Sequence, residues 1–200
     1  FVVVSADDPS MHSSQNEQDN RHYARAARLA MIEPSDSQEC LDFMQDAYEI
    51  SEKFDLPVLY RITTRVSHSK SLVRFGERTE KAVPPYARNI RKFVSSPGNA
   101  YLNHAKVEEN LRALEEYSRL NRMELNGGKV GVVTASITYE YAKDAFPEDT
   151  SFLKLGITNP LPMALIREFA SKVEKLYVIE ELDPFMEEQI RAAGIPCTGK

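Results

Sequence analysis

The first 64 residues alternate between short apolar runs and amphipathic stretches. Residues 1–6 and 57–64 are apolar, β-branched runs of strand length. Between them lie a polar loop at residues 7–20, a short helix at 21–29 and a longer helix at 37–53. The apolar positions of the longer helix recur at helical spacing, as Phe43, Ala47, Ile50 and Phe54. Strand, loop, helix and strand in this order predict an α/β fold.

A second α/β unit is predicted after the chain break at residues 126–128, Asn-Gly-Gly. Its strands are expected at residues 129–135, 152–156 and 176–179. Ser136 is expected to cap the first helix of this unit, and Pro162 to lie in the first turn of the second. A third helix begins at Asp183-Pro184 and ends at Gly194.

The segment between the two units has a different character. Residues 70–92 are rich in Arg and Lys around Pro84-Pro85, and a charged helix is predicted at residues 103–120. We therefore predict three parts: residues 1–69, a linker with a charged helix at 70–127, and a second domain at 128–200.

Composition narrows the possible functions. The chain is 42% hydrophobic and 28% charged with a net charge of −5, so nothing indicates a nucleic-acid or membrane partner. No apolar run approaches the ~20 residues that cross a bilayer, and no signal-peptide pattern is present. The two cysteines are far apart and form no disulfide or metal motif, so a cytoplasmic location is the default. Because residue 1 opens inside an apolar run, we expect an excerpt of a longer protein.

The polar loop after the first strand is the main candidate site. Ligands of open α/β sheets bind beyond the carboxyl ends of strands. His12 could exchange a proton near neutral pH, and Gln15 or Asn16 could orient a carbonyl group. A solvated loop whose Asp, Ser and Asn side chains make turns explains the same residues. The residues alone leave both interpretations open.

Three further groups have a functional and a structural interpretation. Arg65 and His68 could contact a substrate carboxylate, or fix the linker to the first unit, which we favour. The acidic group at residues 180–183 could bind a metal, but a helix N-terminus that attracts carboxylates explains it, so no metal site is predicted. The basic residues at 70–92 could meet an acidic partner protein, or form a solvated surface that faces another part of the same protein, which we favour. His22 and His104 belong to no constellation and receive no role.

Two motifs resemble the pyrimidine-binding domain of thiamine-dependent enzymes. They are an acidic-Pro loop, Asp8-Pro9, with His12 and Glu17, and the element Pro34-x-Asp36-x-x-Glu39, which we assign to helix capping. More specifically, residues 6–21, 63–69 and 180–185 resemble the large subunit of indolepyruvate-type 2-oxoacid:ferredoxin oxidoreductases. The three blocks span most of the chain in the expected order.

This resemblance implies a fold and an activity. It implies part of a three-layer pyrimidine-binding domain followed by a transketolase C-terminal-like α/β domain. The whole enzyme would oxidatively decarboxylate aryl pyruvates to acyl-CoA and reduce ferredoxin, using thiamine diphosphate, Mg²⁺ and [4Fe-4S] clusters. Its implied partners are a smaller beta subunit, ferredoxin, coenzyme A and the aryl pyruvate. His12 would be catalytic, and Gln15, Asn16 and Arg65 would bind substrate.

Several parts of such an enzyme are not in this sequence. The diphosphate-binding Gly-Asp-Gly motif and the cluster cysteines have no counterpart, and the Glu that activates thiamine is expected before residue 1. Cofactor-binding residues are therefore expected outside this chain, and the excerpt alone is expected to be inactive. The alternatives are a transketolase-like aldehyde transferase and a non-catalytic module for subunit assembly. Pyruvate and 2-oxoglutarate types of oxidoreductase fit the His12 loop less well.

Overall fold

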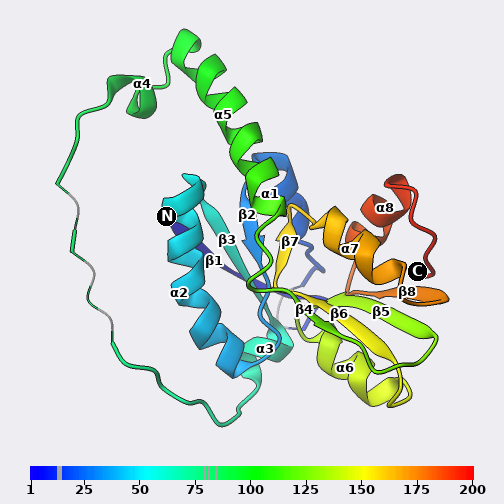
Figure 1. Ribbon diagram of the computed structural model, residues 1–200. Helices are drawn as coiled ribbons and strands as arrows, with labels where there is room; N and C mark the ends of the chain where they lie inside the picture. Colours follow the sequence, from blue (N-terminus) through cyan, green and yellow to red (C-terminus); the bar gives the residue numbers. More distant parts are fainter. Residues whose placement is uncertain (13–14, 79, 81, 84) are drawn as a thin grey trace.

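A computed structural model describes residues 1–12, 15–78, 80, 82–83 and 85–200. Ser13 and Ser14 of the polar loop and Pro84 of the Pro-Pro pair lie outside the described residues. The described chain forms two four-stranded sheets that lie side by side, each with helices packed on it (Figure 1). The predicted α/β class is confirmed.

The first sheet has the strand order β1-β3-β2-β7. β1 (Val2–Asp7), β2 (Ala30–Ile32) and β3 (Val58–Thr63) are parallel, and β7 (Ile157–Asn159) pairs antiparallel with β2. The connections carry α1 (Arg21–Ala27) and α2 (Ser37–Phe54). β2 was not predicted, because three residues are too few to show a period.

Helix α2 begins as its sequence predicts. The Asp36 carboxylate accepts a hydrogen bond of 2.7 Å from the Glu39 amide, and Glu39 in turn accepts one of 2.8 Å from the Ser35 amide. The Asp36–Glu39 element therefore begins the helix, as its assignment to helix capping predicts. The buried face of α2 then packs on the sheet through side chains that include Ala47, Ile50 and Phe54.

The second sheet has the order β4-β6-β5-β8. β5 (Val130–Ala135), β6 (Ser151–Leu155) and β8 (Lys175–Ile179) are parallel, and β4 (Arg122–Glu124) is antiparallel to β6. Its helices are α6 (Thr138–Ala145), α7 (Met163–Ala170) and α8 (Phe185–Ala192). β4 lies inside the predicted linker, so that segment contributes a strand to the second sheet.

One prediction about this unit is wrong. Ser136 does not cap α6: its φ is +53°, and its hydroxyl has no hydrogen-bond partner among the described residues. Ser136 therefore lies in the turn before the helix, in the left-handed backbone region, and no side chain caps α6. The Thr138 hydroxyl instead donates to the carbonyl oxygen of Ala135 at 2.6 Å.

The two sheets are joined by a strand that changes sheet at one residue. β6 ends at Leu155 and β7 begins at Ile157, so only Gly156 separates them. The Asn121 side chain accepts hydrogen bonds from the amides of Gly156 and Ile157, and the Gly156 carbonyl accepts one of 2.9 Å from the Glu33 amide. Because β7 runs antiparallel to β2, the carboxyl end of β6 lies at the carboxyl end of β2.

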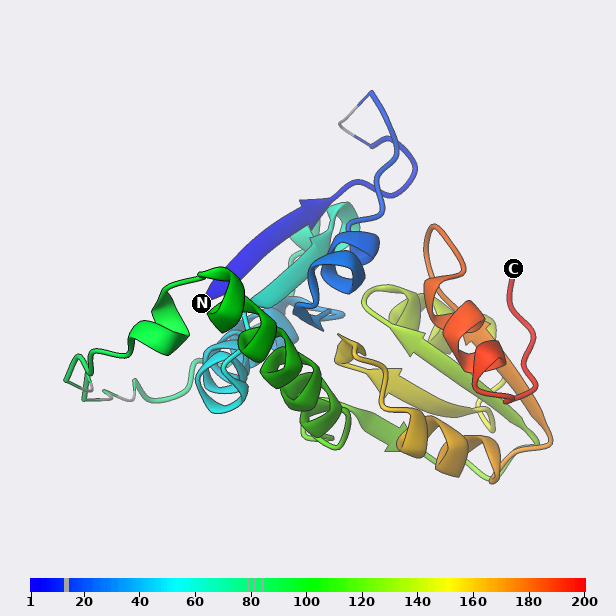
Figure 2. The same cartoon turned by 90° about the horizontal axis from the view of Figure 1, so that it is seen from above.

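The middle of the chain leaves the body and returns. After the short α3 (Thr64–His68), an extended segment bows outward to α4 (Ile90–Phe93) and the long α5 (Pro97–Glu115) (Figures 1 and 2). α5 begins before the predicted residue 103, because Pro97 fits the first helical position. Its carboxyl-terminal part returns to the body, where Leu111 and Leu114 join the core beneath α2.

The largest apolar core is shared by both sheets. Met31 and Leu59 of the first sheet pack in the same cluster as Val133, Leu153 and other side chains of the second. In the described residues, no helix is both long enough and apolar enough to span a membrane.

We predict that Gly156→Ala destabilises the protein. A Cβ at residue 156 would lie 2.3 Å from the Leu120 carbonyl oxygen, which is backbone and cannot move cheaply. We expect a loss of about 1–3 kcal/mol in the free energy of unfolding, measured by urea denaturation. Gly98→Ala is the matched control, because its Cβ would meet no atom within 4 Å. Equal stability of the two variants would contradict the role assigned to Gly156.

Candidate functional site at the junction of the two sheets

The carboxyl ends of strands from both sheets meet at one polar junction. A small buried cavity of about 10 Å³ lies there. It is lined by polar side chains that follow or end β2, β3, β5 and β8, namely Glu33, Arg61, Ser136, Glu180 and Glu181, together with Arg21. Ligands of α/β sheets bind beyond strand carboxyl ends, so this junction is the place to search for a site.

Arg61 is the central charge of the junction. It lies on β3, is 2% exposed and donates to the Asp7 carboxylate from Nε at 2.7 Å. Its guanidinium also donates to Glu33, which accepts a further hydrogen bond from the Thr158 hydroxyl on β7. Asp7 in addition accepts the Asn20 amide at 2.9 Å. Arg61 thus connects β1, β2 and β3, and through Glu33 it is linked to β7.

Arg21 connects the two units through ion pairs and hydrogen bonds, as Arg61 connects the strands of the first sheet. From the start of α1 it donates to Asp19 and to Glu180, each at 2.6 Å, and to the backbone carbonyls of Glu181 and Asp183. Glu180 accepts the amides of Met186 and Glu187 in the first turn of α8. This confirms the helix-N-terminus interpretation for Glu180. The Arg21 guanidinium therefore fixes the loop after β8 against α1.

A further buried ion pair joins β6 to the start of α2. Lys154 of β6 is completely buried and pairs with Glu39, in the first turn of α2. Its ammonium group also lies 4.7 Å from the ring centroid of Phe43. Burial lowers the pKa of Lys154, although the Glu39 charge acts in the opposite direction.

His12 lines a second, open cavity next to the junction. This cavity has a volume of about 280 Å³ and is lined by Pro9, Ser10, His12, Glu17, Glu181, Leu182 and Lys200. Glu181 lines both cavities and so connects the buried junction with the open one. Burial raises the pKa of Glu181, against the nearby charge of Arg61. A carboxyl group with a raised pKa in the lining of a cavity that also contains a histidine is suited to proton transfer.

The loop that carries His12 has a constrained beginning. Ser10 and Met11 both have positive φ, at +68° and +54°, a conformation that costs energy for residues other than glycine. The Glu17 carboxylate accepts the Ser10 amide at 3.0 Å and so closes the loop on itself. At the start of this loop, directly after β1, the Thr64 hydroxyl donates to the Asp8 carboxylate at 2.5 Å and fixes the exit of the strand.

The other predicted site residues lie away from this cavity. Gln15 and Asn16 are exposed on the same loop but do not line the cavity. Arg65 is exposed on α3 and does not line it either. Their roles as substrate-binding residues remain predictions.

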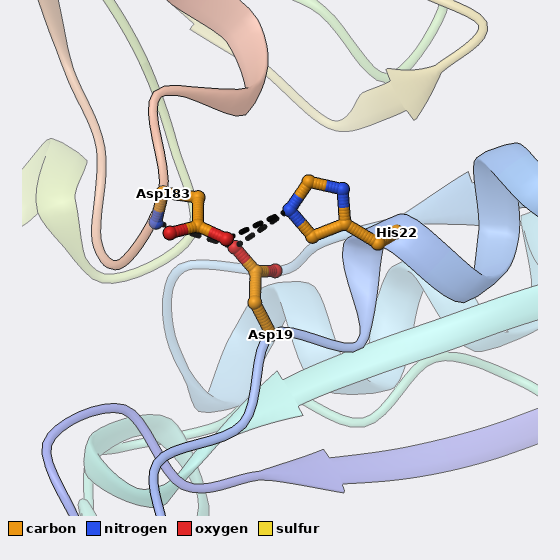
Figure 3. Close-up of side chains that lie close together, drawn as sticks. All are labelled: Asp19, His22 and Asp183. Atoms are coloured by element: carbon orange, nitrogen blue, oxygen red, sulfur yellow. Dashed lines mark hydrogen bonds and ion pairs between the residues drawn. The ribbon is translucent and has the colours of Figure 1, made fainter.

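A constellation around His22 was missed by the sequence reasoning. His22 Nε2 lies 2.9 Å from Asp183 and 3.9 Å from Asp19, so the ring bridges α1 and the loop after β8 (Figure 3). The ligand atoms of these three residues lie within 4.8 Å of one another. Both Asp19 oxygens already accept hydrogen bonds from Arg21. Residues 22 and 183 are far apart in sequence, so no local pattern could have revealed this group.

The described residues do not fit the cofactors that the resemblance implies. Mg²⁺ on a diphosphate takes oxygen ligands, whereas the Asp19–His22–Asp183 group contains an imidazole and an arginine-paired carboxylate. The two cysteines are separate free thiols, and an iron–sulfur cluster needs several thiolates in one place. No step of the reaction can therefore be derived through these groups from this chain.

Two buried basic residues, Arg61 and Lys154, could have been recognised from the sequence. Arg61 is the one charged residue of the strand Val58–Thr63, and Lys154 is the one charged residue of Ser151–Leu155. A strand that is buried on both faces tolerates a charge only when the charge is paired. Isolated charges in such strands therefore indicate buried ion pairs, although not their partners.

The fold is shared with a class of oxidoreductases. The structure superposes on a 2-oxoglutarate:ferredoxin oxidoreductase from Magnetococcus marinus with a TM-score of 0.69 and 14% identity, covering all of this chain and 45% of that one. No protein-family model matches the chain.

Sequence similarity is more specific. The chain is 45% identical over 204 residues to the indolepyruvate oxidoreductase subunit IorA of Methanothermobacter thermautotrophicus, covering 97% of this chain. It is 40% identical to that of Archaeoglobus fulgidus over 98% of the chain, and 37% identical to that of Thermococcus kodakarensis over 100%. The chain spans about a third of the length of these relatives. It is thus a homologue of part of the IorA subunits, and the resemblance seen in the sequence is confirmed.

We predict that Arg61→Met strongly destabilises the fold. The substitution leaves Asp7 and Glu33 as buried carboxylates without their counter-charge, which costs about 3–5 kcal/mol. Urea denaturation followed by circular dichroism measures the loss. Arg65→Met is the control, because Arg65 is exposed four residues further on. A loss below 1 kcal/mol in Arg61→Met would show that the pair network contributes little.

The Asp19–Arg21 pair predicts a specific loss of stability in acid. Burial acts to raise the pKa of Asp19, but hydrogen bonds and charge from Arg21 outweigh it, so this pKa lies below its usual value. The stabilisation is therefore present above the unfolded-state pKa of about 3.9 and is lost as the pH falls toward the folded-state pKa. Between pH 5 and pH 3, urea midpoints should fall more steeply for the wild type than for Asp19→Asn. Parallel pH profiles would contradict this assignment.

Proposed function

We propose that this chain forms part of the large subunit of an enzyme that oxidatively decarboxylates aryl pyruvates, indolepyruvate among them, to aryl-acetyl-CoA and reduces ferredoxin. The observation that carries the proposal is the position of His12, in an open cavity where the carboxyl ends of both sheets converge. The names of the homologous subunits support the substrate class. The subunit would work with a smaller beta subunit, ferredoxin and coenzyme A.

His12 would act at the cavity as a proton donor or hydrogen-bond donor to the substrate. The loop residues with positive φ and the Glu17 contact hold its backbone at the end of β1. Glu181 lines the same cavity from the loop after β8 and would be a second group there that holds a proton. Gln15, Asn16 and Arg65 would bind the substrate once further parts of the subunit enclose the cavity.

Thiamine diphosphate with Mg²⁺, and [4Fe-4S] clusters, would be bound by parts of the enzyme outside this chain. When bound, thiamine diphosphate would supply an electron sink for decarboxylation, and the clusters would supply electron transfer to ferredoxin. The contribution of this chain would be orientation: the paired charges of Arg21, Arg61 and Glu33 keep the cavity floor rigid. Two free thiols are compatible with the reducing cytoplasm in which we place the complex.

The rival functions have less support. A transketolase-like aldehyde transferase shares the domain types, but the matched solved structure and the curated homologues are oxidoreductases. A purely structural module would not need an open cavity lined by both a histidine and a carboxyl group of raised pKa.

The test is anaerobic dye reduction by the native full-length complex. We expect coenzyme-A-dependent reduction that prefers indolepyruvate to pyruvate. His12→Gln should lower kcat/KM about 10²- to 10⁴-fold, the usual contribution of a positioned acid or base. His104→Gln, on the exposed face of α5, is the matched control and should behave as the wild type.

Two outcomes would contradict parts of the proposal. Absence of reduction with every 2-oxoacid, in a complex shown to contain its cofactors, would overturn the activity. Retention of wild-type kcat/KM by His12→Gln would remove His12 from the reaction and favour a role for this region in assembly.

A further inference from the structure

A third cavity, of about 260 Å³, lies where the end of α1 meets α5 and the chain between β7 and α7. Arg25 and Arg28 line it from the end of α1, and Arg112 lines it from the carboxyl-terminal part of α5 (Figure 1). Residues 159–161, after β7, complete its wall. Among the described residues, it shares none with the lining of the junction cavity or of the His12 cavity. It is therefore a separate candidate site.

The base of this cavity consists of side chains that are packed in the fold. Leu111 and Leu161 are both buried, and each belongs to a different apolar core. Asn159 is buried as well, and its side-chain amide donates a hydrogen bond of 2.6 Å to the carbonyl oxygen of Leu29. Because core side chains and a paired amide form its base, the concave shape is built by the fold of this chain.

The charged side chains around the cavity have an excess of positive charge. Three arginines line it against two glutamates, whereas the complete chain has a net charge of −5. Arg28 pairs with Glu108 at 2.9 Å and so holds the end of α1 to α5. In the part of the chain that the structure describes, Arg25 and Arg112 form no ion pair and no side-chain hydrogen bond. Two guanidinium groups of the cavity are thus without an ion-pair partner.

The second acid of the lining, Glu115, does not compensate these charges. It lies on α5, three residues after Arg112. Partial burial raises the pKa of Glu115, although the charge of Arg112 acts in the opposite direction. The attraction between the two side chains is therefore weaker than the cost of removing the Glu115 carboxylate from water.

Unpaired guanidinium groups in a cavity are suited to a carboxylate or a phosphate. Each presents N–H donors in a planar fork that matches two oxygens of such a group. The charges of Arg25 and Arg112 repel each other, so an anion between them is attracted by both. Small-molecule sites combine a few such polar groups with an apolar wall and have volumes of about 300–1,000 Å³. A cavity of about 260 Å³ lies just below this range and therefore suits a small molecule.

We propose that this cavity binds a small organic anion. Its carboxylate or phosphate group is held by Arg25 and Arg112, and its apolar part packs on Leu111 and Leu161. The occupant connects α5 to α1, the helix that begins with Arg21 in the junction. The proposal does not depend on the reaction catalysed.

Binding of matched compounds to the full-length subunit tests this proposal. Isothermal titration calorimetry would compare phenylacetate and phenyl phosphate with phenylacetamide, which resembles phenylacetate but carries no charge. Inorganic phosphate is included because it has no apolar part. We expect one of the two organic anions to bind about tenfold or more tightly than both the amide and inorganic phosphate. Which of them binds more tightly identifies the head group as carboxylate or phosphate.

Substitutions in the lining show whether the anion occupies this cavity. Arg25→Met and Arg112→Met should each raise the dissociation constant of the preferred anion about tenfold, because each removes a charged hydrogen-bond donor. Both side chains are exposed, so the variants should fold, and circular dichroism would check this. Arg88→Met is the matched control, because Arg88 is exposed outside the cavity. His12→Gln should also bind as the wild type does, which separates this site from the His12 cavity.

Several outcomes would overturn the proposal. Equal affinity for the organic anions and the amide would show that the arginines select no anion, and equal affinity for inorganic phosphate would exclude the apolar contact. Unchanged affinity in Arg25→Met and Arg112→Met, or lost affinity in His12→Gln, would place the anion elsewhere. Absence of saturable binding at millimolar concentrations would mean that the cavity takes no ligand of this class, or that another part of the subunit fills it.

Discussion

A single residue between two strands sets the arrangement of the whole molecule. β6 and β7 belong to different sheets, and only Gly156 lies between them. Because β7 is antiparallel to β2, the carboxyl ends of both sets of parallel strands are brought to the same seam. A side chain at residue 156 would collide with the Leu120 carbonyl, so close packing of the two units depends on this glycine.

The seam formed in this way is polar, and its buried charges are paired. Arg61 forms ion pairs with Asp7 and Glu33. Arg21 pairs with Asp19 and Glu180, and Lys154 pairs with Glu39. Such pairs add little net stability compared with apolar packing, but they penalise every arrangement in which a partner is missing. They therefore select one orientation of the two units, and this orientation places Glu181 beside the cavity of His12.

The sequence predicted those elements whose pattern is local. The apolar period of α2, the Asp36–Glu39 cap and the β-branched runs of β1, β3 and β5 all depend on neighbouring residues, and each formed as expected. The three-residue strands β2, β4 and β7 were missed, because they are defined by their partners rather than by a period. Ser136 was misread for a related reason: its residue type favours a cap, but the turn it occupies requires a left-handed backbone.

The candidate site also has some features that contiguous residues predict and others that depend on the tertiary structure. The sequence alone determined the α/β class, the resemblance to a family of oxidoreductases and the polar loop with His12, since these are carried by contiguous residues. Only the tertiary structure decided that Glu181 and His12 line the same cavity, that His22 meets Asp19 and Asp183, and that Arg61 and Arg21 are buried. The physical reason is that a charge is buried only where opposite charges from distant segments surround it, and those segments meet only after the chain has folded.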